Sequence, residues 1–479
     1  MYNNSKKPVL PFFYDYILPN TVMPNALPIE MGVVNYIHTQ FSDRLTTESF
    51  FDEHTEKEDS PFKQMFGKGL GDMPNSLGMN GSYLRNRCYH PSVQIYENSV
   101  YFGRRNLHRD GFRRYVYPIK LTLHFPRCTG RDNVGSKLNG EYFWKHISES
   151  VLKDLRKGDA IVFLDWANEN FIEQGDYQNL HEGIRYSGIP KESIVLSVNS
   201  FNAQEVYENW FSPEDQLLEV RNLPYILCQI SWYYDNNPDI RLNEEIFKSS
   251  KNTIRPNYFL MPIRRARDHR LALLYKFASE GLLDKADWSC HDPVSFEESY
   301  ARANSFPLGY NMEVVKQLHE QIPHSLKDEP GSNYFSVSGW GDQHSKHNLN
   351  SYFYVATETY VHGVYKSMTE KVFKAVANFN PFLFLSFPGA LQELRSLGFK
   401  TFDGFINESY DAEPDNTKRM MMIADEVKRL CAMSQEEIHN WYWSMEDILI
   451  HNHYKLLDIY RNEPHSAKFI GYLFGKTRS

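Results

Sequence analysis

Four arginines in one short stretch have the clearest capacity for binding chemistry in this sequence. They follow a predicted strand at residues 258–261, precede a predicted helix, and are Arg264, Arg265, Arg267 and Arg270, with His269 among them. Ligands of open α/β sheets bind at the carboxyl ends of strands, where helix N-termini attract phosphate. Positive charge at a helix N-terminus is unfavourable unless an anion neutralises it. The pattern therefore predicts that these arginines hold a diphosphate through paired hydrogen bonds; a solvated basic loop is the alternative.

A second predicted helix start combines a carboxylate with a lysine. Lys371 stands in the first turn, where its charge again opposes the helix dipole unless a phosphate binds there. Glu370 beside it can then accept hydrogen bonds from the hydroxyls of a ribose. Ser367 and Glu370 also have the spacing of a capping box, in which Glu370 satisfies only a backbone amide. Both readings of Glu370 stay open.

Two acids end an apolar run and are candidates for catalysis. Residues 159–170 read as a buried strand, and Asp165 and Glu169 lie near its carboxyl end. A carboxylate in this position can act as the general base that deprotonates an acceptor hydroxyl. Glu169 is preferred, because Asp165 lies nearer the buried part of the strand. Surface acids are common, so a role only in solvation is the alternative.

One segment of the chain is strongly basic although the whole protein is acidic. Residues 85–131 carry ten Lys and Arg against Glu97 and Asp110, a net charge of +8. Since the net charge of the whole chain is −8, the remaining residues together carry −16. Such a segment is typical of a surface that contacts a polyanion. The pairs Arg104–Arg105 and Arg113–Arg114 are the candidate nucleic-acid contacts. Pairing of these arginines with acids elsewhere in the fold is the alternative.

The elements that must position these residues alternate between strands and helices. Strands are predicted at 116–125, 159–170, 193–202, 225–234, 258–261, 352–359 and 381–386, and helices at 142–158, 367–380 and 390–399. A further helix follows the arginines, with apolar Leu271, Leu274 and Phe277. Two more close the chain, the last opening with a capping box at Ser434 and Glu437. This alternation predicts doubly wound α/β domains.

A chain of 479 residues is long enough for two domains or more. We expect a loop-rich N-terminal extension at 1–89, an acceptor domain at 90–250, a donor domain at 251–433, and a C-terminal helical part at 434–479 that packs back toward the N-terminal domain. Residues 1–89 are assigned to loops because Asn, Pro, Gly and Met recur there without periodicity.

Several classes of protein are excluded by what the sequence lacks. The five cysteines form no CxxC pair, so neither a structural zinc site nor a disulfide framework is indicated. The N-terminus has no sustained apolar core of a signal peptide, and the most apolar stretch, 381–391, is too short to span a membrane. We therefore expect a soluble, cytoplasmic protein. No motif of a P-loop, a GxGxxG dinucleotide site, a zinc protease, a serine hydrolase or a kinase is present.

The C-terminal part contains a series of short motifs. They are T-E-T at Thr357 to Thr359, T-E-K-x-F-K at Thr369 to Lys374, P-F at Pro381-Phe382, P-G at Pro388-Gly389, S-L-G-F-K-T-F at Ser396 to Phe402 and E-S-Y-D at Glu408 to Asp411. This series resembles a glycosyltransferase family found in phages and some bacteria, whose members share these motifs as a strand end, a helix start, a strand, a turn and the two segments that follow. The arginine stretch looks like the same family's strand-turn-helix, where Asn-Arg usually stands. Pro262 and Ile263 precede Arg264 here, which makes the role of Arg264 less certain than that of Arg270.

The helix start at Glu370 and Lys371 also resembles the donor-binding helix of fucosyltransferase-like enzymes. The resemblance implies an α/β protein with two Rossmann-like domains facing across a cleft, the GT-B arrangement. It also implies a nucleoside-diphosphate sugar as donor, for which we expect a UDP-sugar, and no obligatory metal or other cofactor. We expect the donor to be bound by Arg264, Arg267, Arg270, Glu358, Glu370 and Lys371.

The acceptor is less defined, because residues before 250 resemble no family as closely. Among phage members, a hydroxymethylated pyrimidine in duplex DNA is the acceptor we expect, and the basic segment fits it. A surface or capsid glycan is the alternative acceptor. A non-enzymatic DNA-binding or virion protein on a degenerate transferase fold is the alternative class.

Overall fold

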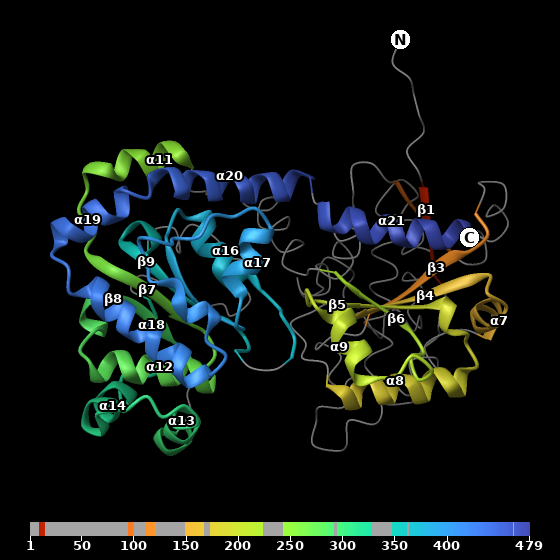
Figure 1. The fold of residues 1–479 in the computed structure, drawn as a ribbon, viewed down its shortest axis with the longest axis horizontal. Helices are drawn as coiled ribbons and strands as arrows, with labels where there is room; N and C mark the ends of the chain where they lie inside the picture. Colours follow the sequence, from red (N-terminus) through yellow and green to blue (C-terminus); the bar gives the residue numbers. More distant parts are fainter. Residues whose placement is uncertain are drawn as a thin grey trace, which may run out of the picture. The chain divides into compact units, whose positions relative to one another are not determined.

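The structure, a computed structural model, describes much of the chain in separate stretches. They are residues 9–14, 94–99, 112–120, 149–166, 173–223, 243–291, 295–326, 347–361, 364–462 and 464–479. The chain divides into two compact units (Figure 1). The first comprises Met1–Cys228 with Asn462–Ser479, and the second comprises Gln229–Arg461.

The first unit contains a six-stranded parallel sheet. Its strands are β1 (Val9–Tyr14), β2 (Gln94–Ser99), β3 (Tyr115–Lys120), β4 (Ala160–Trp166), β5 (Ile194–Val198) and β6 (Glu219–Asn222), in the order β2-β1-β3-β4-β5-β6. Every residue of β5 is buried, as are residues 160–164 of β4. Their continuous apolar sequences follow from this burial on both faces, which parallel sheets require.

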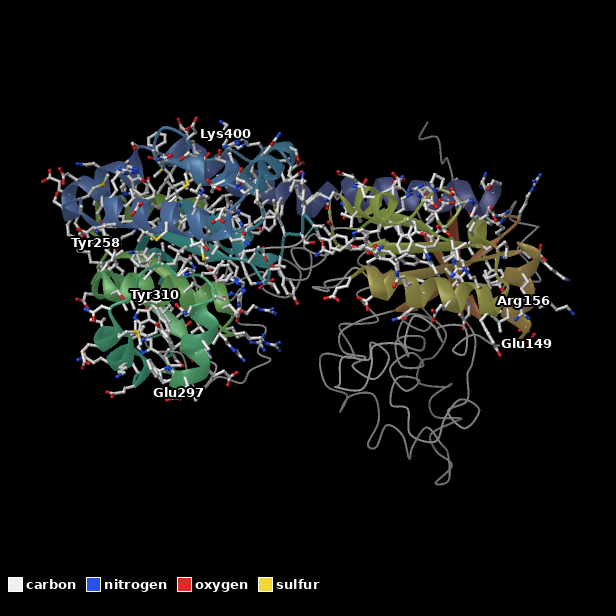
Figure 2. All side chains as sticks on the ribbon, turned by 60° about the horizontal axis from the view of Figure 1, so that its bottom comes forward. Glu149, Arg156, Tyr258, Glu297, Tyr310 and Lys400 are labelled. Carbon is white, nitrogen blue, oxygen red and sulfur yellow. The ribbon has the colours of Figure 1, made fainter. Side chains whose placement is uncertain are left out.

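Helices cover this sheet on two sides. On one side lie α7 (Glu149–Lys157), α8 (Gln174–Ser187) and α9 (Ala203–Trp210), and on the other lies α21 (Pro464–Arg478) (Figure 1). The short helix η6 (Lys191–Ser193) directly precedes β5. The rings of Phe469 and Phe163 in α21 and β4 lie 5.2 Å apart. Glu149, the first residue of α7, and Arg156, near its last residue, form an ion pair of 3.1 Å (Figure 2). Segments from the two ends of the chain therefore share one core.

The second unit contains a four-stranded parallel sheet in the order β10-β9-β7-β8. The strands are β7 (Asn257–Ile263), β8 (Ala286–Cys290), β9 (Ser351–Thr357) and β10 (Phe382–Leu385). The chain moves from β7 to β8 in one direction and from β9 to β10 in the other. Since such crossovers are right-handed, the two intervening helices, α12 (Asp268–Ser279) and α16 (Glu370–Ala377), lie on opposite faces of the sheet (Figure 1).

Further helices complete the second unit. They are α11 (Glu244–Ser249), η7 (Ser250–Asn252), η8 (Leu283–Lys285), α13 (Phe296–Ala303), α14 (Met312–His319), α17 (Ala390–Ser396), η10 (Glu408–Ala412), α18 (Asn416–Cys431), α19 (Gln435–Trp443) and α20 (Glu446–Asn462). Helices α13 and α14 pack on α12, where Tyr310 contacts the ring of Tyr275 (Figure 2). The apolar residues Leu271, Leu274 and Phe277 of α12 are fully buried.

The predicted α/β class with two parallel-sheet units is confirmed by these two sheets. The predicted strands at 159–170, 193–202, 258–261, 352–359 and 381–386 correspond to β4, β5, β7, β9 and β10, and the helix at 390–399 corresponds to α17. The capping box of Ser434 and Glu437 is present at the start of α19. The strand expected at 225–234 lies outside the described residues.

Three features differ from the sequence pattern. Strand β1 lies between β2 and β3 within the stretch whose composition indicates loops. The helix expected to follow Ser434 is divided at residues 444 and 445 into α19 and α20, and α21 follows as a further helix. Of the part at 434–479, residues up to Arg461 belong to the second unit and only Asn462–Ser479 belongs to the first.

None of the helices in the described stretches combines the length and apolar character needed to cross a membrane.

Candidate functional site

The carboxyl ends of β7 and β9 lie side by side in the second sheet, at the point where the connections to the next strands diverge in opposite directions. These two strands are neighbours, and their following segments lead to α12 and α16 respectively. In doubly wound sheets, ligands bind at the point where consecutive connections diverge. The arginine stretch follows β7, and the T-E-T motif ends β9. The fold therefore brings both sequence-predicted groups to the same edge of one sheet.

The arginines after β7 divide into an outward and an inward group. Arg264 and Arg265 are exposed, and the guanidinium of Arg267, the N-cap of α12, lies 4.8 Å from the ring of Tyr360. Arg270 is buried. Its Nη2 donates hydrogen bonds to the carbonyl oxygens of Thr357 at 3.1 Å and Glu358 at 2.9 Å.

Arg270 therefore attaches the start of α12 to the end of β9. Its neighbour His269 does the same, with Nε2 lying 2.8 Å from the carbonyl oxygen of Glu358. Of the other three arginines, Arg264 and Arg265 are exposed and Arg267 is partly exposed. Arg270, for which the resemblance implies the firmer role in donor binding, is thus bonded inside the fold, and that role stays a prediction.

Glu358 is buried to 1% exposure, and both of its carboxylate oxygens are engaged. Oε1 accepts a hydrogen bond from the backbone N–H of Thr369 at 2.7 Å. Oε2 accepts from the backbone N–H of Thr359 at 2.9 Å and from the hydroxyl of Thr369 at 2.7 Å. The side chain of Glu358, which we expected to contact the nucleotide-sugar donor, therefore points into the protein.

Lys371 lies at the centre of a polar cluster formed by both strand end and helix start. Its ammonium donates to the hydroxyl oxygens of Thr369 at 2.7 Å and Thr359 at 3.1 Å. It lies 3.4 Å from the carboxylate of Glu370 and 3.8 Å from that of Glu358. The side chain keeps 18% of its surface exposed, so the ammonium is held in place and still reachable.

Glu370 is the first residue of α16 and does not act as a capping-box residue. The N-cap is Thr369, whose side chain makes no capping hydrogen bond, so Ser367 and Glu370 do not occupy the two capping positions. Oε1 of Glu370 faces Lys371 and Lys374, at 3.4 and 4.0 Å. Burial disfavours ionisation of Glu370, but Lys371 and Lys374 outweigh it and hold its pKa below its ordinary value.

The second carboxylate oxygen of Glu370 is the unusual atom of this cluster. Oε2 is buried, and no group in the described stretches donates a hydrogen bond to it. A buried acceptor without a donor costs about 1–3 kcal/mol, more when it is charged. This arrangement is typical of a site completed by a ligand that supplies the donor.

The E-S-Y-D motif has a structural role beside the cluster. Asp411 accepts hydrogen bonds from the backbone N–H groups of Leu391 and Gln392, at 2.9 and 3.4 Å, and so caps α17 from another element. Burial raises the pKa of both Asp411 and Glu408. The N-terminus of α17 is therefore served by a carboxylate from another element, as the N-cap residue of α16 is by Glu358.

Two contributors to the edge were not singled out from the sequence. Arg302 in α13 donates through Nη1 to the carbonyl oxygen of Ala266 at 3.0 Å and braces the arginine stretch. Thr359 positions Lys371. Thr359 is part of the quoted T-E-T motif, which could have indicated it. Arg302 carries no signal in the sequence, since the contact depends on how α13 packs on α12.

The candidate residues of the first unit lie at opposite ends of its sheet. Asp165 is the penultimate residue of β4, paired in register with Lys120 of β3 and Ser197 of β5. Arg113 and Arg114 precede β3 at the amino end, and their backbone N–H groups donate to the carbonyl oxygen of Thr477 in α21. Glu169, Arg104 and Arg105 lie outside the described residues.

Within the stretches that the structure describes, no three His, Cys, Asp or Glu side chains are grouped so that they could hold a metal ion.

No protein-family model and no curated protein matches this chain. Three solved structures are similar to it over most of their length. One is the N-terminal domain of a trehalose-6-phosphate phosphatase from Candida albicans (TM-score 0.41, 9% identity, 98% of this chain and 97% of that one). Another is described as an OtsA apo structure (0.38, 12%, 97% and 99%). The third is a UDP-forming α,α-trehalose-phosphate synthase from Burkholderia vietnamiensis (0.36, 10%, 84% and 78%). These low values indicate neither a common fold nor a shared activity.

Proposed function

We propose that the chain is a glycosyltransferase that moves a sugar from a nucleoside-diphosphate sugar to a hydroxyl acceptor. The observation that carries the proposal is the buried Oε2 of Glu370, which lacks a donor among the described residues, while Oε1 of the same carboxylate lies 3.4 Å from the ammonium of Lys371. A ribose hydroxyl supplies the missing hydrogen bond, and the adjacent phosphate binds Lys371. The family motifs around both residues support the same reading.

The exposed arginines complete the diphosphate site. Arg264 and Arg267 lie at the start of α12, and Lys371 lies at the start of α16, where the two helices flank the ends of β7 and β9. The bond from the sugar carbon to the β-phosphate oxygen breaks, and its electron pair stays on the diphosphate. Cationic side chains and helix N-termini stabilise this charge where it develops. Arg270 supports the site from within the fold.

The acceptor hydroxyl forms the new bond to the sugar and loses its proton to a base. We assign this base to Glu169 or Asp165, which follow the apolar run of β4. We expect a UDP-sugar as donor and a hydroxymethylated pyrimidine in duplex DNA as acceptor. The support for DNA is the net charge of +8 on residues 85–131.

A glycan acceptor is the second candidate, and one observation favours it. Arg113 and Arg114 are bonded through their backbones to α21, and Nη1 of Arg113 donates to the carbonyl oxygen of Ser479. They precede β3, so they lie at the sheet edge away from Asp165. Part of the basic segment is thereby explained by contacts inside the first unit.

The decisive experiment measures separately how the nucleoside and the phosphates contribute to binding. Titration calorimetry of the wild-type chain is expected to detect binding of UDP and weaker binding of inorganic pyrophosphate. Glu370→Ala is expected to weaken UDP binding by about tenfold and to spare pyrophosphate, since only the nucleoside supplies hydroxyl donors. Glu393→Ala, a change in the first turn of the capped helix α17, is the matched control. Equal losses for both ligands would contradict the role of Glu370.

The acceptor is then identified by mass. The chain is incubated with a panel of nucleotide sugars and either hydroxymethylated duplex DNA or oligosaccharides, and the products are analysed by mass spectrometry. A hexose or pentose mass added to the modified nucleoside supports the DNA acceptor. Addition only to oligosaccharide supports the glycan acceptor, and UDP binding without transfer to either supports a non-enzymatic protein.

A further inference from the structure

Glu358 connects three elements at the carboxyl edge of the second sheet. Its backbone N–H donates to the carbonyl oxygen of Leu385 in β10 at 2.9 Å. Its own carbonyl oxygen accepts from Arg270 in the first turn of α12. Its carboxylate binds the N-cap residue of α16, Thr369, through both the backbone N–H and the hydroxyl. One residue therefore fixes the relative placement of β10, α12 and α16.

The carboxylate is linked to Lys371 through a shared hydroxyl. The hydroxyl of Thr369 donates to Oε2 of Glu358 and accepts from the ammonium of Lys371, each at 2.7 Å. The hydroxyl is consequently turned away from the helix, which explains why Thr369 provides no side-chain cap to α16. The ion pair of Glu358 with Lys371, at 3.8 Å, adds attraction in the same direction.

We propose that Glu358 is a positioning residue for donor binding: it acts through Thr369 and Lys371 and does not itself contact the donor. The inference rests on the proposed function, because it specifies how the donor site is held. A lysine oriented in advance loses less conformational freedom when a phosphate binds, and this raises affinity without a direct contact. The 1% exposure of Glu358 and its full set of in-chain hydrogen bonds exclude it from the ligand surface.

Glu358→Gln tests this role with little change in size. The two oxygens accept from the backbone N–H groups of Thr369 and Thr359 respectively, so either orientation of the amide sets its NH2 against an N–H donor. One backbone bond is lost and the negative charge near Lys371 is removed. Asp411→Asn is the matched control, because Asp411 also binds two backbone N–H groups at a helix start but forms no hydrogen bond or ion pair with Lys371.

The experiment is a double-mutant cycle read by UDP affinity. Glu358→Gln is expected to weaken UDP binding about tenfold in the wild-type chain, and less than about twofold in the Lys371→Ala background. Asp411→Asn is expected to leave UDP affinity within about twofold. Equal losses in both backgrounds, or no loss in either, overturn the inference, since Glu358 then does not act through Lys371.

Thr369 provides a second variant that keeps the carboxylate, should Glu358→Gln not fold. Thr369→Val removes the shared hydroxyl, and Thr369→Ser retains it. UDP affinity is expected to fall with valine and to be restored with serine; equal affinities for the two variants overturn the inference. If the wild-type chain binds no UDP, the proposed function fails first, which distinguishes that outcome from a failure of the Glu358 assignment.

Discussion

Two helices, one in each unit, follow the carboxyl end of a buried parallel strand and differ in the charges at their starts. Helix α8 follows β4 and starts with acids: Glu173 and Asp176 form a reciprocal capping box, and Oδ2 of Asp176 accepts from the backbone N–H of Glu173 at 2.8 Å. Helix α16 follows β9, its N-cap residue Thr369 provides no side-chain cap, and its first turn carries Lys371 beside Glu370. The start of α16 therefore combines a lysine with an acid, whereas the start of α8 has acids alone.

We propose that this difference reflects separate roles of the two units. Acids at a helix N-terminus satisfy the backbone amides and the helix dipole, so α8 needs no external anion. Lys371 of α16 has the carboxylates of Glu370 and Glu358 at 3.4 and 3.8 Å, and a bound diphosphate would add further negative charge at this helix start. We therefore assign the charged donor to the second unit and the uncharged acceptor hydroxyl to the first.

The largest effect is expected from the acceptor side. Glu169→Gln removes the assigned base with little change in size, and turnover is expected to fall by about 10²–10⁴-fold while UDP affinity is unchanged. Asp165→Asn is the matched variant, and kcat and the Kd of UDP are measured for both. Wild-type turnover in Glu169→Gln moves the role to Asp165. Full activity in both variants contradicts the assignment of the acceptor site to β4.

On the donor side, Lys371→Ala is expected to weaken UDP binding by about 1.5–3 kcal/mol, the range for hydrogen bonds to charged groups, and to leave the fold intact. Calorimetric titration gives the affinity, and circular dichroism checks the fold. Lys374→Ala is the control for the loss of a positive charge on the same helix, because Lys374 also faces Glu370, at 4.0 Å. Unchanged UDP affinity in Lys371→Ala would contradict the assignment of the phosphate site to the start of α16.

The arginines after β7 allow stability and binding to be separated. Arg270→Ala leaves the buried carbonyl oxygens of Thr357 and Glu358 without their donor, so the free energy of unfolding is expected to fall by about 1–3 kcal/mol. Arg264→Ala removes an exposed side chain and is expected to weaken UDP binding without this loss of stability. Urea denaturation measures the first effect and calorimetry the second. An Arg270→Ala protein with unchanged stability and impaired UDP binding would show that Arg270 contacts the ligand.

The smallest effect is expected from Arg113 and Arg114, whose neutralisation tests the DNA acceptor. Each lost phosphate contact lowers the slope of log K against log salt concentration by about 0.9. Neutralising Arg104 and Arg105 together is expected to lower that slope for duplex DNA. The pair Arg113 and Arg114, next to α21, is expected to change it little. Unchanged slopes for both pairs favour the glycan acceptor.

Short-range sequence patterns determined much of the local structure. Apolar runs predicted β4, β5, β9 and β10, because strands buried on both faces of a parallel sheet must be apolar throughout. Helical spacing predicted the buried face of α12, and the capping box at Ser434 predicted the start of α19, since both depend on residues three or four positions apart. The concentration of charge at the starts of α12 and α16 was likewise visible in the sequence.

The direction in which each charged side chain points was decided only by tertiary structure. Arg270 and Arg264 are six positions apart in one basic stretch, yet Arg270 is buried because the end of β9 presents two carbonyl oxygens to it. Glu358 and Asp411 bind backbone amides of segments 11 and 20 residues away along the chain. Strand β1, with its polar and proline-rich surroundings, is a strand because β2 and β3 pair with it, and α21 joins the first unit through contacts with residues more than 300 positions earlier. Such contacts depend on which segments the fold brings together, and spacing within the sequence carries no record of them.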